Sequence, residues 1–413
     1  MSKLERLIQQ YCPDGVEYVP LSSIGTIKRG NGLQKKDFVK AGIGCIHYGQ
    51  IYTKFGLFTN KTLTYVDKEL ADHLLHIEKG DLVIACTSEN VEDVCKAVAW
   101  LGDDSIVTGG HSCVLHHNQN PKYIAYFFQT ESFQRQKRKY AYGTKVIDIK
   151  PDSIGKIEIP LPPLPVQEEI VRILDAFTEL QAELQAELQK RKQQYNYYLD
   201  NLLNFKNINR RGGYQAEVRW MKMSDTCLKI CSGGTPSRKK AYYFKGGIPW
   251  LRTQEVDWNN IYDTEIKITA EAIKNSSARL IPENCVIIAM YGATAGKTGI
   301  NKIPLTTNQA CCNLQINPQI ALYKFVYYWI CKNYEKIKSL GQGSQNNINA
   351  QIVKDYPIPI PSLVEQQRIV SILDRFDTLT NDLTAGLPAE IEKRRQQYEY
   401  YRDKLLTFKR KGA

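Results

Sequence analysis

One stretch occurs twice in this chain: Lys190-Arg191-Lys192-Gln193-Gln194-Tyr195-Asn196-Tyr197-Tyr198 recurs as Lys393-Arg394-Arg395-Gln396-Gln397-Tyr398-Glu399-Tyr400-Tyr401. Carried on to Lys206 and Lys409, the copies share 12 identities in 17 positions, and residues 160–180 and 359–379 share 11 in 21. Solenoid repeats are much shorter than this separation. The pattern therefore predicts a tandem duplication of a whole domain together with its connecting helix.

The composition is that of a large, basic, globular protein. A chain of 413 residues exceeds one ordinary core, which predicts two or three domains. Lys and Arg total 55 against 43 Asp and Glu, giving a net charge of +12. This excess favours a polyanionic partner; the alternative on charge alone is a merely basic soluble protein.

The cysteines and the apolar runs predict a cytoplasmic protein. Eleven cysteines are an odd number without a regular framework, so we expect reduced thiols. Met1–Gln10 carries charges and no apolar core, unlike a secretory signal. No run of 18 apolar residues is present, so we expect no membrane span.

Changes in composition and apolar spacing along the chain predict an α+β fold in four segments. Two β-rich globular domains, residues 1–163 and 209–362, alternate with helical connectors at residues 164–208 and 363–413. The linker Arg210-Arg211-Gly212-Gly213 precedes the second domain. Leu82–Ala85 matches Val286–Ala289 as a buried strand, and Tyr126-Phe127-Phe128 matches Tyr327-Tyr328-Trp329 within a helix.

The connectors have the apolar spacing of a coiled coil. Alternate steps of four and three residues from Ile170 reach mostly apolar or aromatic positions as far as Phe205. A seam of this length needs a partner, and the other copy is at the highest effective concentration. We expect the helices to pair antiparallel with pseudo-two-fold symmetry; the alternative is that each packs separately on its own domain. Four extra residues around Gly386-Leu387-Pro388 predict a break in the second copy.

Three kinds of chemistry find no support. Tyr291–Thr298 has three residues between its glycines, where a nucleotide-binding P-loop needs four. Cys227, Cys231 and the adjacent Cys311-Cys312 lack zinc spacing, so no metal is expected. Neither a nucleophile elbow nor a duplicated histidine with a nucleophile is present, so no catalytic residue is expected.

What remains in both copies is a set of basic, amide, hydroxyl and aromatic residues in glycine-punctuated loops. Arg, Asn and Gln can contact base edges, whereas Lys and Thr favour phosphates. Any single such residue is more often part of a solvated turn, but their occurrence in both copies of a basic chain favours DNA reading. The candidate DNA-binding residues are Lys28, Arg29, Lys35, Lys36, His47, Tyr48, Lys145, Ser232, Thr235, Arg238, Arg252, Thr253, Gln254, Tyr291, Thr294, Lys297, Gln345 and Asn346.

The chain resembles the specificity subunit of type I restriction-modification systems over nearly its whole length. The strings that carry the resemblance are weak singly but specific in order and in duplicate. They are Asp14–Tyr18, Ile27–Gly30, Ile46–Gly49, Ser232–Pro236, Ile248–Arg252, Ala289–Thr294, Asn308–Cys311 and the two Gln-x-x-Ile-Val-x-Ile-Leu-Asp segments at Gln167 and Gln366.

The resemblance implies a non-catalytic, sequence-specific DNA-binding subunit. Each domain would read half of a bipartite double-stranded DNA target, and the helices would set the spacing and dock two methyltransferase subunits. Adenine-N6 methylation and ATP-dependent cleavage would belong to methyltransferase and restriction subunits that use S-adenosylmethionine, ATP and Mg²⁺. The candidate docking residues are Ile170, Leu174, Phe177, Tyr195, Tyr198, Ile369, Leu373, Phe376, Tyr398 and Tyr401.

The sequence is also compatible with two other functional classes. One is a coiled-coil interaction scaffold with non-specific nucleic-acid binding. The other is a self-sufficient methyltransferase or nuclease.

Overall fold

The computed structural model describes residues 1–205, 218–341, 347–382 and 384–412. The chain forms two compact units, one made of Met1–Gln185 with Glu390–Ala413 and the other of Ala186–Ala389. Each unit therefore combines a globular domain with parts of two different long helices. The predicted linker at residues 210–213, together with Gln345 and Asn346, lies outside the described residues.

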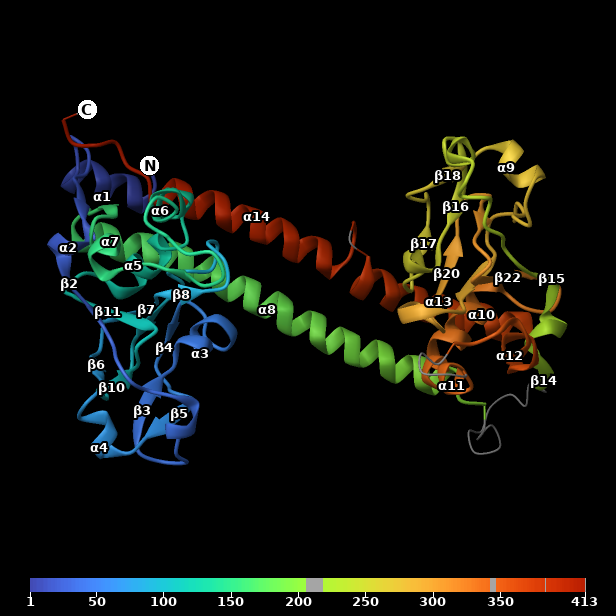
Figure 1. Ribbon diagram of the computed structural model, residues 1–413, viewed down its shortest axis with the longest axis horizontal. Helices are drawn as coiled ribbons and strands as arrows, with labels where there is room; N and C mark the ends of the chain where they lie inside the picture. The colour runs from blue at the N-terminus through green and yellow to red at the C-terminus, as the bar shows by residue number, and fades with distance from the viewer. Residues whose placement is uncertain (206–217, 342–346, 383, 413) are drawn as a thin grey trace. The chain divides into compact units, whose positions relative to one another are not determined.

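The globular domain of the first unit contains two main sheets (Figure 1). The five-stranded sheet has the order β2 (Gly25–Arg29), β11 (Ser112–His117), β7 (Leu82–Ala85), β9 (Ala97–Trp100), β4 (Phe58–Thr59). The four-stranded sheet has the order β5 (Thr64–Val66), β3 (Ile43–Ile46), β10 (Ile106–Thr108), β6 (Leu75–Ile77). Two short ladders join β1 (Tyr18–Pro20) to β13 (Glu158–Pro160) and β8 (Thr87–Ser88) to β12 (Ile147–Asp148).

The globular domain of the second unit repeats the five-stranded sheet, whereas its smaller sheet has three strands. Its five-stranded sheet has the order β15 (Cys227–Ser232), β22 (Cys311–Ile316), β19 (Val286–Ala289), β20 (Thr298–Asn301), β17 (Asn260–Ile261). The smaller sheet has the order β18 (Lys267–Ile268), β16 (Ile248–Leu251), β21 (Thr306–Thr307), and β14 (Arg219–Lys222) pairs with β23 (Pro357–Ile360). The predicted match of Leu82–Ala85 with Val286–Ala289 is confirmed, since both are fully buried central strands.

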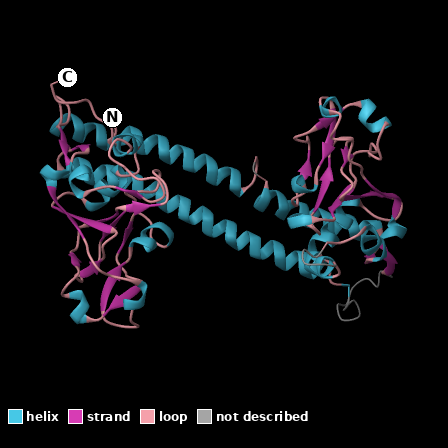
Figure 2. Cartoon of the chain, viewed as in Figure 1, coloured by secondary structure: helices cyan, strands magenta, loops and turns pink. Residues whose placement is uncertain are grey.

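Short helices complete the two domains (Figure 2). In the first they are α1 (Lys3–Tyr11), α2 (Leu21–Ile24), η1 (Lys35–Asp37), α3 (Tyr48–Thr53), α4 (Lys68–Ala71), α5 (Pro121–Phe127), α6 (Glu131–Lys137) and α7 (Pro151–Gly155). In the second they are η3 (Met223–Thr226), η4 (Ala241–Phe244), η5 (Thr253–Glu255), α9 (Ala270–Lys274), η6 (Gly292–Thr294), α10 (Tyr323–Lys332), α11 (Tyr334–Ser339) and α12 (Ala350–Asp355).

The long helices follow the sequence pattern. Helix α8 runs without interruption from Leu164 to Leu202, whereas the second copy is divided into α13 (Leu363–Asn381) and α14 (Leu387–Leu405). The predicted break is confirmed: Pro388 lies in the first turn of α14, where a helix needs no backbone donor from it.

The same buried contacts attach α8 to the first globular domain and α13 to the second. The Gln167 side chain accepts from the backbone N–H of Asn120 at 3.1 Å and donates to the carbonyl of Pro162 at 2.8 Å. Gln366 does the same with Leu322 and Pro361, at 2.9 Å for both. Both glutamines are completely buried.

A matched aspartate forms the second anchor and corrects one part of the sequence comparison. Asp175 binds Lys122 and Tyr126, each at 2.7 Å. Asp374 binds Lys324 at 2.6 Å and Tyr328 at 2.7 Å. Tyr126 therefore matches Tyr328, one residue later than the sequence comparison placed it. Two aromatic triplets can be aligned in more than one register from sequence alone. The matched bonds to Asp175 and Asp374 fix the register of the alignment.

The long helices pack together within each unit. In the first, Phe177 of α8 stacks on Tyr401 of α14 at a ring-centroid distance of 5.6 Å. In the second, Tyr198 of α8 stacks on Phe376 of α13 at 5.0 Å. Each contact joins a phenylalanine of one copy to a tyrosine of the other, as a pseudo-two-fold pairing of the duplicated helices requires.

Candidate nucleic-acid interface

The loops after β3 and β16 place candidate residues at matched positions of the two domains. In the first domain, Gln50 Oε1 accepts from the backbone N–H of His47 at 3.0 Å. In the second, Glu255 Oε1 accepts from the backbone N–H of Arg252 at 3.2 Å. His47-Tyr48 and Arg252-Thr253 thus begin the same type of capped turn, with different side chains on one backbone frame.

In the first domain these residues belong to a row of rings. The His47 and Tyr48 rings lie 4.5 Å apart, and Tyr48 lies 4.7 Å from His111. The backbone N–H of Gly49 donates to His47 Nδ1 at 3.2 Å. Partial burial, assisted by Lys35 and His111, lowers the pKa of His47, so the neutral ring carries its proton on Nε2. His47 can therefore donate a hydrogen bond from that atom.

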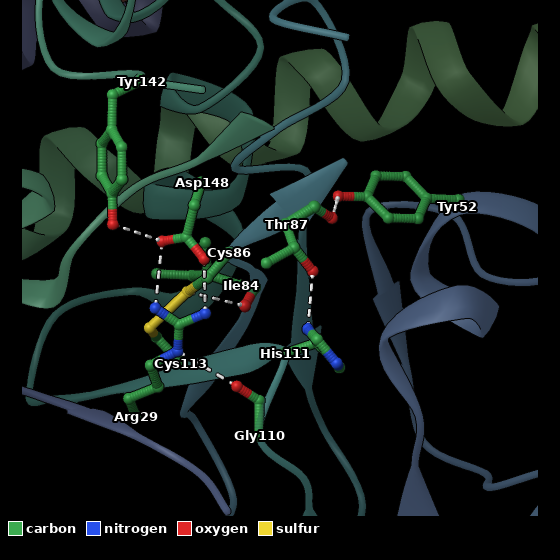
Figure 3. Close-up of a disulfide and its surroundings, with 10 residues drawn as sticks. All are labelled: Arg29, Tyr52, Ile84, Cys86, Thr87, Gly110, His111, Cys113, Tyr142 and Asp148. Carbon is green, nitrogen blue, oxygen red and sulfur yellow. Dashed lines mark hydrogen bonds and ion pairs between the residues drawn. A yellow bond between two sulfur atoms is a disulfide. The ribbon is translucent and has the colours of Figure 1, made fainter. Parts of the chain in front are cut away.

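Arg29 is engaged inside the domain (Figure 3). Its guanidinium makes two hydrogen bonds to the carboxylate of Asp148, at 3.0 and 2.6 Å, and a third to the carbonyl of Gly110 at 3.0 Å. The Tyr142 hydroxyl donates to the same carboxylate at 3.2 Å. Arg29 thus fixes the turn between Tyr142 and Asp148, which carries Lys145. Arg29 therefore positions a loop, and its predicted contact with DNA stays a prediction.

A disulfide lies beside this ion pair and overturns one expectation. Cys86 and Cys113 are bonded, where the sequence predicts reduced thiols throughout. Cys86 follows β7 and Cys113 lies in the adjacent strand β11, which brings their Cα atoms to 6.3 Å although 27 residues separate them in sequence. That proximity comes from strand pairing, which the spacing of the cysteines does not reveal. The other nine cysteines are free.

Four predicted lysines are exposed on the first domain: Lys28, Lys35, Lys36 and Lys145. Within the residues that the structure describes, none of the four lies in a salt bridge. Solvated ammonium groups of this kind suit phosphate contact, because they gain a partner without losing one.

Three of the predicted residues of the second domain are held by ion pairs or hydrogen bonds within that domain. Arg252 contacts Glu255 at 3.3 Å and also pairs with Glu265, and Gln254 accepts from the Arg252 guanidinium at 2.9 Å in its better-satisfied orientation. Lys297 pairs with Asp257 at 2.6 Å.

Hydroxyl groups in the same domain hold loops together. Thr294 donates to the carbonyl of Thr253 at 3.0 Å, which joins η6 to η5. Thr235 contacts the side chain of Gln309. Ser232, Arg238 and Tyr291 are exposed.

The predicted docking residues also divide by exposure. Ile170, Leu174, Ile369 and Leu373 are completely buried in the cores of their units, and Tyr398 is nearly so. These five residues pack in the hydrophobic cores of the units, and their docking role stays a prediction. Phe177, Tyr195 and Phe376 are half-buried, whereas Tyr198 and Tyr401 are about two fifths exposed, at 38% and 41%.

Several residues at these sites were missed by sequence reasoning. Tyr197 and Tyr400 are 63% and 60% exposed at matched helix positions. Both lie in the stretch of sequence that occurs twice, and this repetition could have pointed to them. His111, Thr87 and Asp148 carry no local motif, and strand pairing alone brings them to the loops.

Among the described residues, no group of three or more His, Cys, Asp or Glu side chains could hold a metal ion. No helix in this part of the chain is both long and apolar enough to cross a membrane.

Two copies of one α+β domain, each followed by a long helix that packs on the other copy's helix, define a tandem recognition subunit. The type I restriction modification DNA specificity domain matches residues 13–193 and 217–393. The chain is 35% identical to the Escherichia coli EcoR124I/EcoR124II specificity subunit, over 99% of this chain and 97% of the relative. It belongs to the specificity-subunit family of type I restriction-modification systems.

Solved structures share the fold. The type I S subunit from M. genitalium aligns at a TM-score of 0.57 and 15% identity, covering 95% of this chain and 96% of that one. A chain from a structural study of type I complex assembly and conformational transition aligns at 0.62 and 17%, covering 95% and 97%. The protein is thus a non-catalytic DNA specificity subunit with two target recognition domains.

Proposed function

We propose that each domain reads one half of a bipartite DNA target through the loops after β3 and β16. The observation that carries this proposal is the shared capped turn that presents His47-Tyr48 in one domain and Arg252-Thr253 in the other. One backbone frame with different polar side chains suits two domains that dock alike and read different bases. We place the functional segments at residues 1–163, 164–208, 209–362 and 363–413.

Phosphate contacts supply the salt-sensitive part of the affinity. Lys28, Lys35, Lys36 and Lys145 in the first domain and Arg238 in the second are exposed cations suited to this role. Each phosphate contact contributes about −0.9 to the slope of log affinity against log salt. Replacing Lys35 and Lys36 with alanine should make that slope shallower by about 2 without changing the half-site sequence.

The helices space the half-sites and dock two methyltransferase subunits. Tyr197 and Tyr400 support this proposal, because the duplication presents the same large exposed side chain on α8 and on α14. Two equal docking surfaces fit two copies of one partner. Adenine-N6 methylation, S-adenosylmethionine, ATP and Mg²⁺ belong in this proposal to the methyltransferase and restriction subunits.

A domain exchange tests the two-domain proposal. Residues 210–361 are replaced by those of a relative with a different target, and DNA from cells that also carry the methyltransferase is sequenced for modified bases. The expected result is a change in one half of the methylated sequence. A change in both halves, or in neither, would contradict the assignment of one half-site to each domain.

A further inference from the structure

His111 ends the row of rings in the first domain, at the turn between β10 and β11. Its side chain is exposed, and the Tyr48 ring lies 4.7 Å away on one side. The Thr87 hydroxyl contacts His111 Nδ1 at 3.0 Å (Figure 3). Among the described residues, Thr87 is the hydrogen-bond partner of this imidazole, and Nε2 is left for a ligand.

Thr87 is itself held firmly. It is almost fully buried, its backbone carbonyl accepts from the Tyr52 hydroxyl at 2.7 Å, and β8 pairs it with Asp148 of β12. The Asp148 side chain is in turn bound by Arg29. A chain of fixed groups therefore sets the orientation of an exposed imidazole, which reduces the entropy that the ring would lose on binding.

The second domain lacks this group. Cys86 N–H donates to the carbonyl of His111 at 2.8 Å, and at the matched place Met290 N–H donates to the carbonyl of Ala310 at 2.8 Å. Ala310 offers no polar side-chain atom. The imidazole is thus a difference between the domains, on a frame that they share.

We infer that His111 is a specificity-determining residue of the first domain, whose Nε2 contacts a base edge in the half-site that this domain reads, and that Thr87 is its positioning residue. The inference rests on the proposed function of the domain. A single hydrogen bond of this kind would change the discrimination at one base pair by about 5- to 100-fold.

The test uses the full chain assembled with its methyltransferase and reads out the methylated sequences in DNA. The expected result for His111→Ala is a relaxed preference at one position of one half-site, with the other half unchanged. His111→Gln should alter the preference at the same position, because it keeps a polar group with a different reach. Thr87→Val should relax that position as well, whereas Thr87→Ser, which keeps the hydroxyl, should retain the preference.

His76→Ala is the matched control. His76 is also an exposed imidazole of the first domain whose Nδ1 lies near a hydroxyl, that of Ser105 at 3.3 Å, but it lies on β6 outside the row of rings. Its replacement should leave both half-sites intact. An unchanged half-site in His111→Ala and His111→Gln would overturn the inference while the proposed function stands. A wild-type complex that modifies no defined sequence would instead overturn the proposed function.

Discussion

Phe177 stacks on Tyr401 with their rings 24° from parallel, and the duplicated residues Phe376 and Tyr198 stack at 25°. The same two residue types therefore meet in both units, each time across the two copies. An aromatic pair of this kind stabilises by about 1 kcal/mol beyond the area it buries.

A double-mutant cycle measures the first of these contacts. Phe177→Ala and Tyr401→Ala should each lower the free energy of unfolding. The loss in the double variant should be smaller than the sum of the two single losses by about 1 kcal/mol. Denaturant unfolding of the full chain gives the free energies. Tyr400, which is 60% exposed beside Tyr401, is the control, and its cycle with Phe177 should show no coupling. Equal coupling in both cycles would show that the stack is not specific.

The buried amides of Gln167 and Gln366 should be essential to the attachment of the helices. Gln167→Leu leaves the Asn120 N–H and the Pro162 carbonyl without their buried partner, and each unsatisfied group costs about 1–3 kcal/mol. Unfolding titrations should show a loss of that order, and Gln366→Leu should behave alike. Gln193, an exposed glutamine of α8, is the matched control and should tolerate leucine.

Glu169 predicts a defined pH dependence. Arg172 first, and then Lys3, lower its pKa from the ordinary 4.5 to about 2. Because the folded-state pKa is depressed, this stabilisation is fully present above about pH 4.5 and is lost as pH falls toward 2. Melting temperatures measured between pH 5 and pH 2 (roughly the range of this loss) should fall less steeply for Glu169→Gln. Parallel curves for the two proteins would rule out this source of acid sensitivity.

The Arg29–Asp148 pair should stabilise the turn that carries Lys145. Arg29→Met removes hydrogen bonds to a charged group, so we expect a loss of about 2 kcal/mol in unfolding free energy. Hydrogen exchange should show faster opening of residues 142–148. The control is Arg138→Met, because Arg138 is exposed and lies 3.4 Å from Glu131, where a surface pair contributes well under 1 kcal/mol. Unaltered exchange in the turn would contradict the positioning role.

The disulfide is checked by counting thiols. The denatured, unreduced chain should alkylate at nine cysteines, and at all eleven after reduction. Mass spectrometry of the tryptic peptides should then place the late label on Cys86 and Cys113. Alkylation of all eleven cysteines before reduction would contradict the disulfide and support the fully reduced state that the composition predicts.

The duplication, the long helices and the break before Pro388 could all be predicted from the sequence. These features are encoded locally, in periodic apolar positions, in proline and in a string of residues repeated almost unchanged. The sequence also indicated the loops at His47 and Arg252, because their polar residues stand beside glycine and strand patterns.

The partners of the candidate residues came from long-range packing. Arg29 looks like a DNA contact in sequence, but Asp148, 119 positions away, takes up its guanidinium. Ile170 and Leu174 lie on the predicted seam, but the domain core buries them. The orientation of His111 depends on Thr87 and Tyr48, which strand pairing brings from distant parts of the chain. Periodicity specifies which face of an element is apolar, whereas the identity of the partner is set by long-range packing that no local pattern contains.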